Sequence, residues 1–183
     1  NEKVLNFMHK KIKKNQLNDF RLKIINQISK DENYRYSYFK AASPYLESIV
    51  GNELVMQKKI NLSIQLPEDQ DSLLAVHSDV WSGDSPFEVV VWLPLVNCFK
   101  TKSMYILPAN LINQFNKKIS KKNYQNSEKV FQLIKKKVKW IKINYGQVLI
   151  FNQSLPHGNR VNKEAETRWS LNCRFKNIFS PYG

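Results

Sequence analysis

Two histidines and an aspartate carry the strongest chemical signal in the sequence. His77 and Asp79 are separated by one residue at the end of the apolar stretch 73–76, and His157 lies within the segment 155–159. Side chains two residues apart in an extended strand point to the same side, so His77 and Asp79 are predicted to converge. If His157 reaches the same point, these residues supply the two imidazoles and one carboxylate of a non-haem Fe(II) centre, which leaves three adjacent positions open.

The ligand set leaves alternatives for both the carboxylate and the metal. Asp84 and Glu88 are acidic residues close to His77, but their spacing suits a shared strand face less well than that of Asp79. Mn, Co, Ni and Zn fit the same donors as iron, because the order of metal affinities alone does not select Fe(II). The third histidine, His9, falls in a lysine-rich helical segment and is expected at the surface.

A second kind of site is indicated by the last strand pattern, over residues 167–175. One face of this strand carries four polar side chains: Arg168, Ser170, Asn172 and Arg174. A guanidinium in a partly dry pocket binds a carboxylate through two hydrogen bonds, and the hydroxyl of Ser170 can add a third. A 2-oxo dicarboxylate would fit between a metal with open positions and such a carboxylate-binding arginine. Arg168 is the favoured clamp, and Arg174 is the alternative.

Taken together, the motif His77-x-Asp79, the distal His157 and the pair Arg168-x-Ser170 resemble the Fe(II)/2-oxoglutarate-dependent oxygenases. The order of elements looks most like the phytanoyl-CoA dioxygenase superfamily. Three stretches also look like the small bacterial oxygenases of sporadic carbohydrate-biosynthesis clusters: 61–67, 77–95 and 101–107.

Two further segments resemble superfamily motifs. Residues 103–108 take the place of its Gly-x-Leu-x-x-x-Pro-Gly segment, and residues 146–151 resemble its Gly-Asp-Val-x-x-Phe strand before the distal histidine. The resemblance covers roughly residues 44–180. It departs from the pattern at residues 109–110, Ala-Asn in place of Gly-Ser, and at Gln147 in place of Asp, while all three candidate metal ligands are kept.

The resemblance implies a mechanism and a set of roles. 2-Oxoglutarate would chelate Fe(II), with its 5-carboxylate held by Arg168 and Ser170, and with O2 would give succinate, CO2 and oxidation of a substrate C–H bond, usually hydroxylation. Gln65 is predicted as a second 2-oxoglutarate contact. The substrate side is assigned to Trp81, Asn159 and Arg174. The expected substrate is a small metabolite, such as a sugar or a nucleotide-linked compound.

The composition is strongly basic but does not favour nucleic acid. The formal net charge is +14 and the isoelectric point is near 9.7, yet only five of the 29 basic residues are arginines. Nucleic-acid readers generally use more arginine, so we interpret the lysines as a solvated surface. Cys98 and Cys173 lack metal-site spacing and are expected as buried free thiols. Without an apolar run of about 20 residues, a cytoplasmic protein with no membrane partner is expected.

Helices are predicted mainly at the start of the chain. Apolar residues recur at helical spacing over residues 4–28, and residues 33–42 are Tyr-rich and irregular. Ser43 and Pro44 read as the N-cap and first position of a short helix that ends before Gly51.

Strands dominate the rest of the chain. Alternating or continuous apolar patterns indicate them in five further places: 53–66, 87–95, 102–110, 138–143 and 147–151, the last two around a turn at 145–146. In the strand predicted within residues 53–66, the polar face is expected to line a cavity and the apolar face to pack on the N-terminal helices.

These elements predict an α+β fold in one domain over residues 1–183. Residues 1–52 form the helical part, and residues 53–183 form a double-stranded β-helix, a cupin-like jelly roll, with the N-terminal helices packed on one sheet. A partly helical insertion is expected at about 111–137. Two other functions stay open: a cupin-like metal enzyme, such as an isomerase or a 2-oxoglutarate-independent dioxygenase, and a non-catalytic basic binding module.

Overall fold

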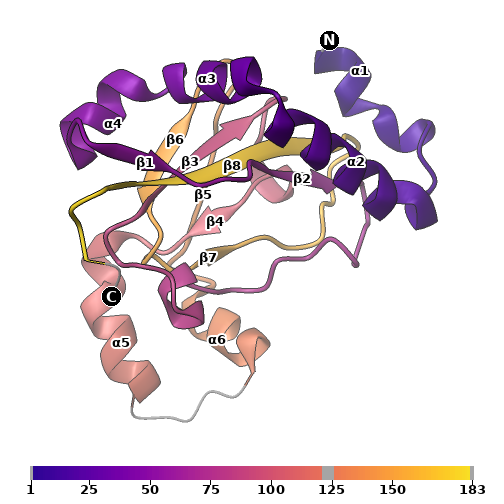
Figure 1. Ribbon diagram of the computed structural model, residues 1–183. Coiled ribbons are helices and arrows are strands. Elements are labelled where there is room, and N and C mark those ends of the chain that lie inside the picture. The colour runs from indigo at the N-terminus through magenta and orange to yellow at the C-terminus, as the bar shows by residue number, and fades with distance from the viewer. Residues whose placement is uncertain (1, 121–125, 182–183) are drawn as a thin grey trace.

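Two antiparallel sheets form the centre of the computed structural model, which describes residues 2–120 and 126–181. The larger sheet has the order β1–β8–β3–β6 with β2 also paired to β8, and the smaller has the order β5–β4–β7 (Figure 1). The strands are β1 (Leu54–Met56), β2 (Asn61–Gln65), β3 (Val89–Pro94), β4 (Tyr105–Ile106), β5 (Lys139–Trp140), β6 (Leu149–Asn152), β7 (His157–Gly158) and β8 (Arg168–Asn177).

Helices cover the larger sheet and flank the smaller one (Figure 1). They are α1 (Glu2–Asn6), α2 (Leu17–Lys30), α3 (Glu32–Lys40), α4 (Ser43–Val50), α5 (Ile112–Ser120) and α6 (Ser127–Ile134). Short 3-10 turns are η1 (Met8–Lys10), η2 (Lys14–Gln16), η3 (Asp79–Ser82), η4 (Lys100–Lys102) and η5 (Ala109–Leu111). Among the described residues, no helix combines the length and apolarity that a membrane crossing requires.

The N-terminal helices agree with the sequence pattern in part. Helical structure over residues 4–28 and the short helix α4 are confirmed, and Gly51 adopts a φ of 100° where α4 ends. The N-cap of α4 is Ala42 rather than Ser43, which lies within the helix. The irregular segment expected at 33–42 was wrong, because α3 occupies it. Asp31 caps α3 by accepting a hydrogen bond from the backbone N–H of Tyr34.

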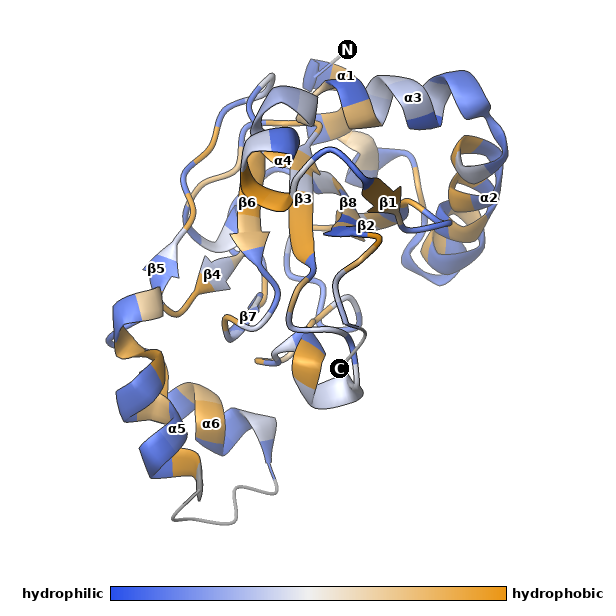
Figure 2. Cartoon of the chain, turned by 60° about the vertical axis from the view of Figure 1, so that its left-hand side comes forward, coloured by the Kyte–Doolittle hydropathy of each residue, from blue (hydrophilic) through white to orange (hydrophobic). Residues whose placement is uncertain are grey.

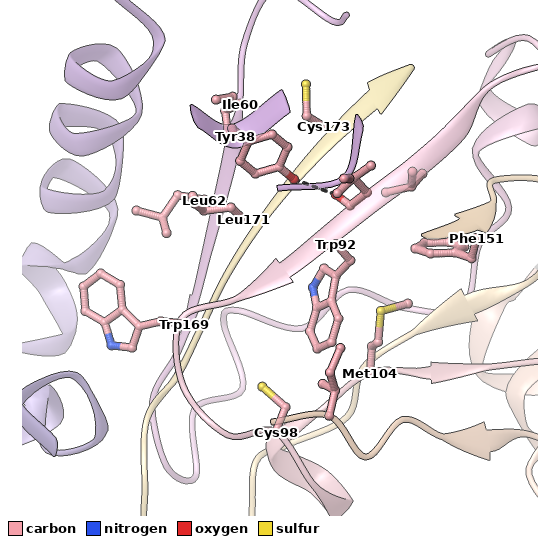
Figure 3. Packing of buried hydrophobic residues seen from close by; sticks show 14 of the residues in the cluster. Tyr38, Ile60, Leu62, Trp92, Cys98, Met104, Phe151, Trp169, Leu171 and Cys173 are labelled. Carbon is pink, nitrogen blue, oxygen red and sulfur yellow. Dashed lines mark hydrogen bonds between the residues drawn. The ribbon is translucent and has the colours of Figure 1, made fainter. Parts of the chain in front are cut away.

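Tyr38 ties α3 to the larger sheet. Its buried hydroxyl donates a 2.7 Å hydrogen bond to the carbonyl oxygen of Val91 in β3, drawn as a dashed line in Figure 3. Tyr38→Phe is therefore expected to lower the free energy of unfolding by about 1 kcal/mol. Chemical denaturation measures this, with Tyr36→Phe as the matched control, because Tyr36 lies on the same helix and is 60% exposed. Equal losses in both variants would contradict the assigned contact.

The alternation predicted for the last strand is confirmed in β8. Its apolar side chains are buried in the main hydrophobic cluster: Trp169, Leu171, Cys173 and Phe175. Figure 3 labels the first three of them. On β2, which pairs with β8, Leu62 and Ile64 join the same cluster, together with apolar residues of α2, α3 and α4. The polar faces of both strands therefore point away from the helices, as predicted. Cys98 and Cys173 are buried free thiols, also as predicted.

The remaining strand patterns agree with the structure in part. Residues 73–79 do not form a ladder strand, since His77 makes only an isolated bridge and Asp79 begins η3. The patterns at 138–143 and 147–151 become β5 and β6, which belong to different sheets. The α+β class with antiparallel sheets is confirmed. The double-stranded β-helix stays a prediction, because the two sheets form no closed barrel among the described residues.

The insertion expected at about 111–137 contains α5 and α6. Figure 2 shows that both helices carry hydrophobic and hydrophilic residues. Phe115, Val130 and Ile134 pack with Tyr105 and Leu107, so these helices bury their apolar sides against the smaller sheet. Residues 121–125 of the insertion lie outside the described residues.

Candidate metal centre

The three predicted metal ligands lie together. His77 and His157 are antiparallel bridge partners, and their backbones exchange hydrogen bonds of 2.9 and 2.8 Å. Their ring centroids are 4.2 Å apart, and Nε2 of His77 is 3.4 Å from Oδ1 of Asp79. One donor atom from each of the three residues lies within 4.8 Å of the others. Neither Asp84 nor Glu88 belongs to this group.

Hydrogen bonds fix which imidazole nitrogen is free. Nδ1 of His77 lies 2.8 Å from the carbonyl oxygen of Ala75, and Nδ1 of His157 lies 2.8 Å from that of Leu155. A carbonyl oxygen only accepts, so each Nδ1 carries a hydrogen, and in the neutral ring Nε2 keeps its lone pair. Metal-binding histidines usually donate the N–H of the ring nitrogen that is not bound to the metal in this way. The hydrogen bond orients the ring and raises its basicity.

Local backbone geometry places Asp79 beside His77. Ser78 is extended, with φ −126° and ψ 132°, so its two neighbours project to the same side, as the spacing predicted. The backbone N–H of Asp79 donates to the carbonyl oxygen of Gln153 at 3.1 Å, and the hydroxyl of Ser78 donates to that of Ser154 at 3.0 Å. These bonds join the segment of the first two ligands to the loop that precedes His157.

The environment favours a neutral imidazole at His157 and a charged carboxylate at Asp79. At His77 burial alone would lower the pKa, but hydrogen bonds to Asp79 and to the carbonyl oxygen of Ala75 outweigh it and raise the pKa. Burial, together with the nearby His77, lowers the pKa of His157 to about 4. For Asp79, burial alone would raise the pKa, but interactions with His77, His157 and Arg174 outweigh it and lower the pKa below its ordinary value. Neutral imidazole and ionised carboxylate are the forms that bind a metal.

A cavity of about 370 Å³ opens beside these three residues, between the two sheets. Its wall includes all four polar residues that the sequence placed on one face of β8. The lining residues are Asn61, Ser63, Leu74, His77, Asp79, Val90, Trp92, Met104, Phe151, His157, Gly158, Asn159, Arg168, Ser170, Asn172 and Arg174. The predicted polar cavity is therefore present, and the candidate ligands and both candidate clamps face it.

Arg168 is a buried cation without a counter-charge. Arg168 is only 3% exposed. Among the described residues, no carboxylate lies within ion-pair distance of its guanidinium. Its Nη1 donates to the carbonyl oxygen of Ser103 at 3.2 Å, and its Nη2 donates to the hydroxyl of Ser63 at 2.9 Å. Burial lowers its pKa to about 10, so it stays charged at neutral pH.

Unpartnered polar atoms surround this guanidinium. Nε of Arg168 and the hydroxyl oxygens of Ser170 and Ser103 are buried with no hydrogen-bond partner in the protein. Buried polar groups normally have partners, and leaving one unpaired costs about 1–3 kcal/mol. A guanidinium without a counter-charge beside such donors can bind an anion.

The remaining predicted residues divide between the cavity and its surroundings. Asn159 lines the cavity, although its side chain also accepts a 2.6 Å hydrogen bond from the backbone N–H of Leu74. Gln65 does not line it and donates instead to the carbonyl oxygen of Arg160 at 2.7 Å. Trp81 also lies outside the lining, is 51% exposed, and stacks on Phe115 at 6.1 Å. The proposed ligand contacts of these three residues stay predictions.

Two residues that contact Arg168 had no assigned role in the sequence analysis. Ser63 lies on the polar face of β2, opposite Ser170, and that face was predicted to line a cavity. Its contact with Arg168 follows from the pairing of β2 with β8, which the sequence did not reveal. Ser103 accepts the hydrogen bond from Arg168 through its backbone carbonyl, a group that any residue has, so its side chain gave no signal for this contact.

Gly158 is packed too tightly for a side chain. A Cβ atom there would lie 2.7 Å from the Tyr105 hydroxyl, 2.8 Å from the carbonyl oxygen of Leu74 and 3.0 Å from that of Ala75. Gly158→Ala is expected to cost about 1–3 kcal/mol of unfolding free energy and to weaken Ni(II) binding, because the carbonyl of Ala75 orients His77.

Thermal unfolding and Ni(II) titration measure the two effects. Gly146→Ala is the control, since Gly146 has open space around it and pays only for its φ of 87°, about 1 kcal/mol. Unchanged Ni(II) affinity in Gly158→Ala would show that the segment carrying His77 tolerates displacement.

No family model and no curated protein matches the sequence. Solved structures of non-haem oxygenases share its fold. ThoJ, a non-heme monooxygenase in complex with nickel, gives a TM-score of 0.60 at 15% identity over 90% of this chain and 68% of that chain. HygX from Streptomyces hygroscopicus, with nickel and 2-oxoglutarate bound, gives 0.59 at 11% identity over 93% of this chain and 81% of that chain.

A third similar structure is SnoK, a non-heme alpha-ketoglutarate-dependent carbocyclase from nogalamycin biosynthesis, with a TM-score of 0.60 at 12% identity over 85% of this chain and 62% of that chain. The chain therefore has the fold of a group of non-haem oxygenases, some of them 2-oxoglutarate-dependent. At these identities the likeness concerns the fold, and the chemistry must be argued from the site.

Proposed function

We propose that this protein is an Fe(II)- and 2-oxoglutarate-dependent dioxygenase that oxidises a C–H bond of a small metabolite. Hydroxylation is the proposed outcome. The observation that carries the proposal is the buried, unpaired guanidinium of Arg168 in the same cavity as His77, Asp79 and His157. A metal site alone fits many enzymes. A metal site facing a separate carboxylate clamp fits a chelating 2-oxo dicarboxylate.

The donor set fits a divalent metal. In their neutral forms the two imidazoles offer Nε2 lone pairs beside a carboxylate, and the Nδ1 atoms of both rings are hydrogen-bonded to backbone carbonyls. His77, Asp79 and His157 would hold the metal. When bound, Fe(II) with 2-oxoglutarate supplies the oxidation of a C–H bond by O2, with release of succinate and CO2.

The residues around Arg168 fit a carboxylate. Nε of Arg168 and the hydroxyl group of Ser170 lack partners in the protein, and because both residues line the cavity, an anion there would supply acceptors for them. Arg168 and Ser170 would orient the distal carboxylate of 2-oxoglutarate. The apolar side chains of Val90, Trp92 and other lining residues exclude water and strengthen these interactions.

Narrower assignments belong to the same proposal. We infer a double-stranded β-helix domain related to the phytanoyl-CoA dioxygenase superfamily, supported by the motifs around His77 and His157 and by the two antiparallel sheets. A sugar or a nucleotide-linked compound is the proposed substrate. The motif resemblance to oxygenases of carbohydrate-biosynthesis clusters supports this substrate class.

Anaerobic titration with Fe(II) and then 2-oxoglutarate tests the proposed function. A weak metal-to-ligand charge-transfer band in the green region is expected only when 2-oxoglutarate chelates the iron. Iron binding without the band would indicate a cupin-like metal enzyme of another kind. Absence of both would favour a non-catalytic binding module, and either result would overturn the proposal.

A further inference from the structure

Arg174 lies between the candidate carboxylate ligand and a second carboxylate. Its Nη2 is 3.3 Å from Oδ2 of Asp79 and 3.2 Å from Oδ2 of Asp84. The other oxygen of Asp79, Oδ1, is the one near Nε2 of His77, at 3.4 Å. The two oxygens of Asp79 therefore face different partners, with Oδ1 toward His77 and Oδ2 toward the guanidinium.

The fold builds this arrangement from separate elements. Arg174 projects from the inner face of β8, opposite Val90 of β3. Gly83, with a φ of 94°, ends η3 in the left-handed region, and the chain then turns so that the backbone N–H of Asp84 donates to the carbonyl oxygen of Asp79 at 3.4 Å. This turn sets the two carboxylates side by side against one guanidinium.

Arg174 differs from Arg168 in what it offers a ligand. Both line the cavity, but Arg174 is already paired with two carboxylates, whereas Arg168 has none among the described residues. An arginine whose single positive charge is already paired with two carboxylates has little attraction left for a dicarboxylate. Its contacts point instead to the metal ligand beside it.

A carboxylate ligand can bind a metal through one oxygen or through two. In a site of two histidines and one carboxylate, ligation through two oxygens would occupy one of the three open positions. We propose that Arg174, held by Asp84, is a positioning residue that retains Oδ2 of Asp79, so that Asp79 binds the metal through Oδ1 alone and a position stays open for O2. This inference rests on the proposed function and concerns the geometry of the same site.

Nitric oxide, a stable substitute for O2, tests the open position in the anaerobic protein loaded with Fe(II) and 2-oxoglutarate. Arg174→Gln removes the charge but keeps a long polar side chain. The charge-transfer band is expected to persist, because the three ligands and Arg168 are intact. The nitric oxide affinity, followed by electron paramagnetic resonance, is expected to fall about tenfold, because Oδ2 of Asp79 loses the ion pair that holds it.

Arg174→Lys and Arg160→Gln complete the experiment. The lysine variant keeps a cationic donor and is expected to recover nitric oxide affinity to within about threefold of wild type. Arg160 pairs with Glu128 outside the cavity, so Arg160→Gln is the matched control and is expected to behave as wild type.

Two results would overturn the inference. One is wild-type nitric oxide affinity in Arg174→Gln, and the other is equal loss in the Gln and Lys variants, which indicates a general structural role. Should Arg174→Gln not fold, the comparison of Arg174→Lys with wild type decides, since a loss greater than tenfold rejects the inference. A wild-type protein without the charge-transfer band would instead refute the proposed function, so the two failures are distinguishable.

Discussion

His157→Ala is expected to abolish metal binding while leaving the protein folded. His157 is one of the three candidate metal ligands among the described residues. Loss of a residue that only hydrogen-bonds to a metal ligand lowers metal affinity by about 10- to 100-fold, so loss of a ligand itself should weaken Fe(II) or Ni(II) binding by more than about a hundredfold. The charge-transfer band with 2-oxoglutarate should disappear with the metal. Calorimetric titration with Ni(II) and anaerobic absorption spectra measure these effects.

His9→Ala is the matched control for this experiment. The chain has three histidines, and His9 is the one outside the cavity, where Nδ1 lies 2.9 Å from the hydroxyl of Thr167. Its replacement should leave metal affinity unchanged. If His157→Ala keeps Ni(II) affinity within about threefold of wild type, the three residues do not form the metal site.

Arg168→Ala is expected to separate 2-oxoglutarate binding from metal binding. Loss of two charge-assisted hydrogen bonds should lower 2-oxoglutarate affinity by at least about a hundredfold, while Ni(II) affinity changes by less than about threefold. The Ni(II)-loaded protein allows both affinities to be measured by calorimetry. Because the guanidinium is buried without a counter-charge, a polar replacement such as Arg168→Gln should lower the free energy of unfolding by no more than about 1 kcal/mol.

Arg174→Ala provides the contrast for this prediction. Its guanidinium is occupied by Asp79 and Asp84, so its loss should affect 2-oxoglutarate affinity far less than the loss of Arg168. Unchanged 2-oxoglutarate affinity in Arg168→Ala together with its loss in Arg174→Ala would exchange the roles of the two arginines.

The sequence was sufficient to predict the polar wall of the cavity. In β8 every second side chain is polar, and β-strand geometry requires those side chains to share a face, so Arg168 and Arg174 could be placed before any pairing was known. The same alternation rule brought His77 and Asp79 together, although the segment around them is not a strand. Only Ser78 needs to be extended for the rule to hold.

Features that depend on contacts between distant segments were not predictable. The helix α3 has a weak apolar pattern, and it forms where Asp31 caps its start and Tyr38 reaches β3. Partners within the site also come from distant segments, as with Ser63 for Arg168. The pairing of Asp84 with Arg174 depends on the turn at Gly83, and sequence spacing alone made Asp84 only an alternative metal ligand.

The central claim is that His77, Asp79 and His157 hold a single metal ion in the cavity beside Arg168. Crystals grown with Ni(II) and 2-oxoglutarate, with diffraction data collected at the nickel absorption edge, test it directly. One anomalous peak is expected at about 2.0–2.2 Å from Nε2 of both histidines and from one oxygen of Asp79, with a carboxylate of the ligand against Arg168. A well-ordered nickel ion bound elsewhere, with no metal between these three residues, would contradict the account.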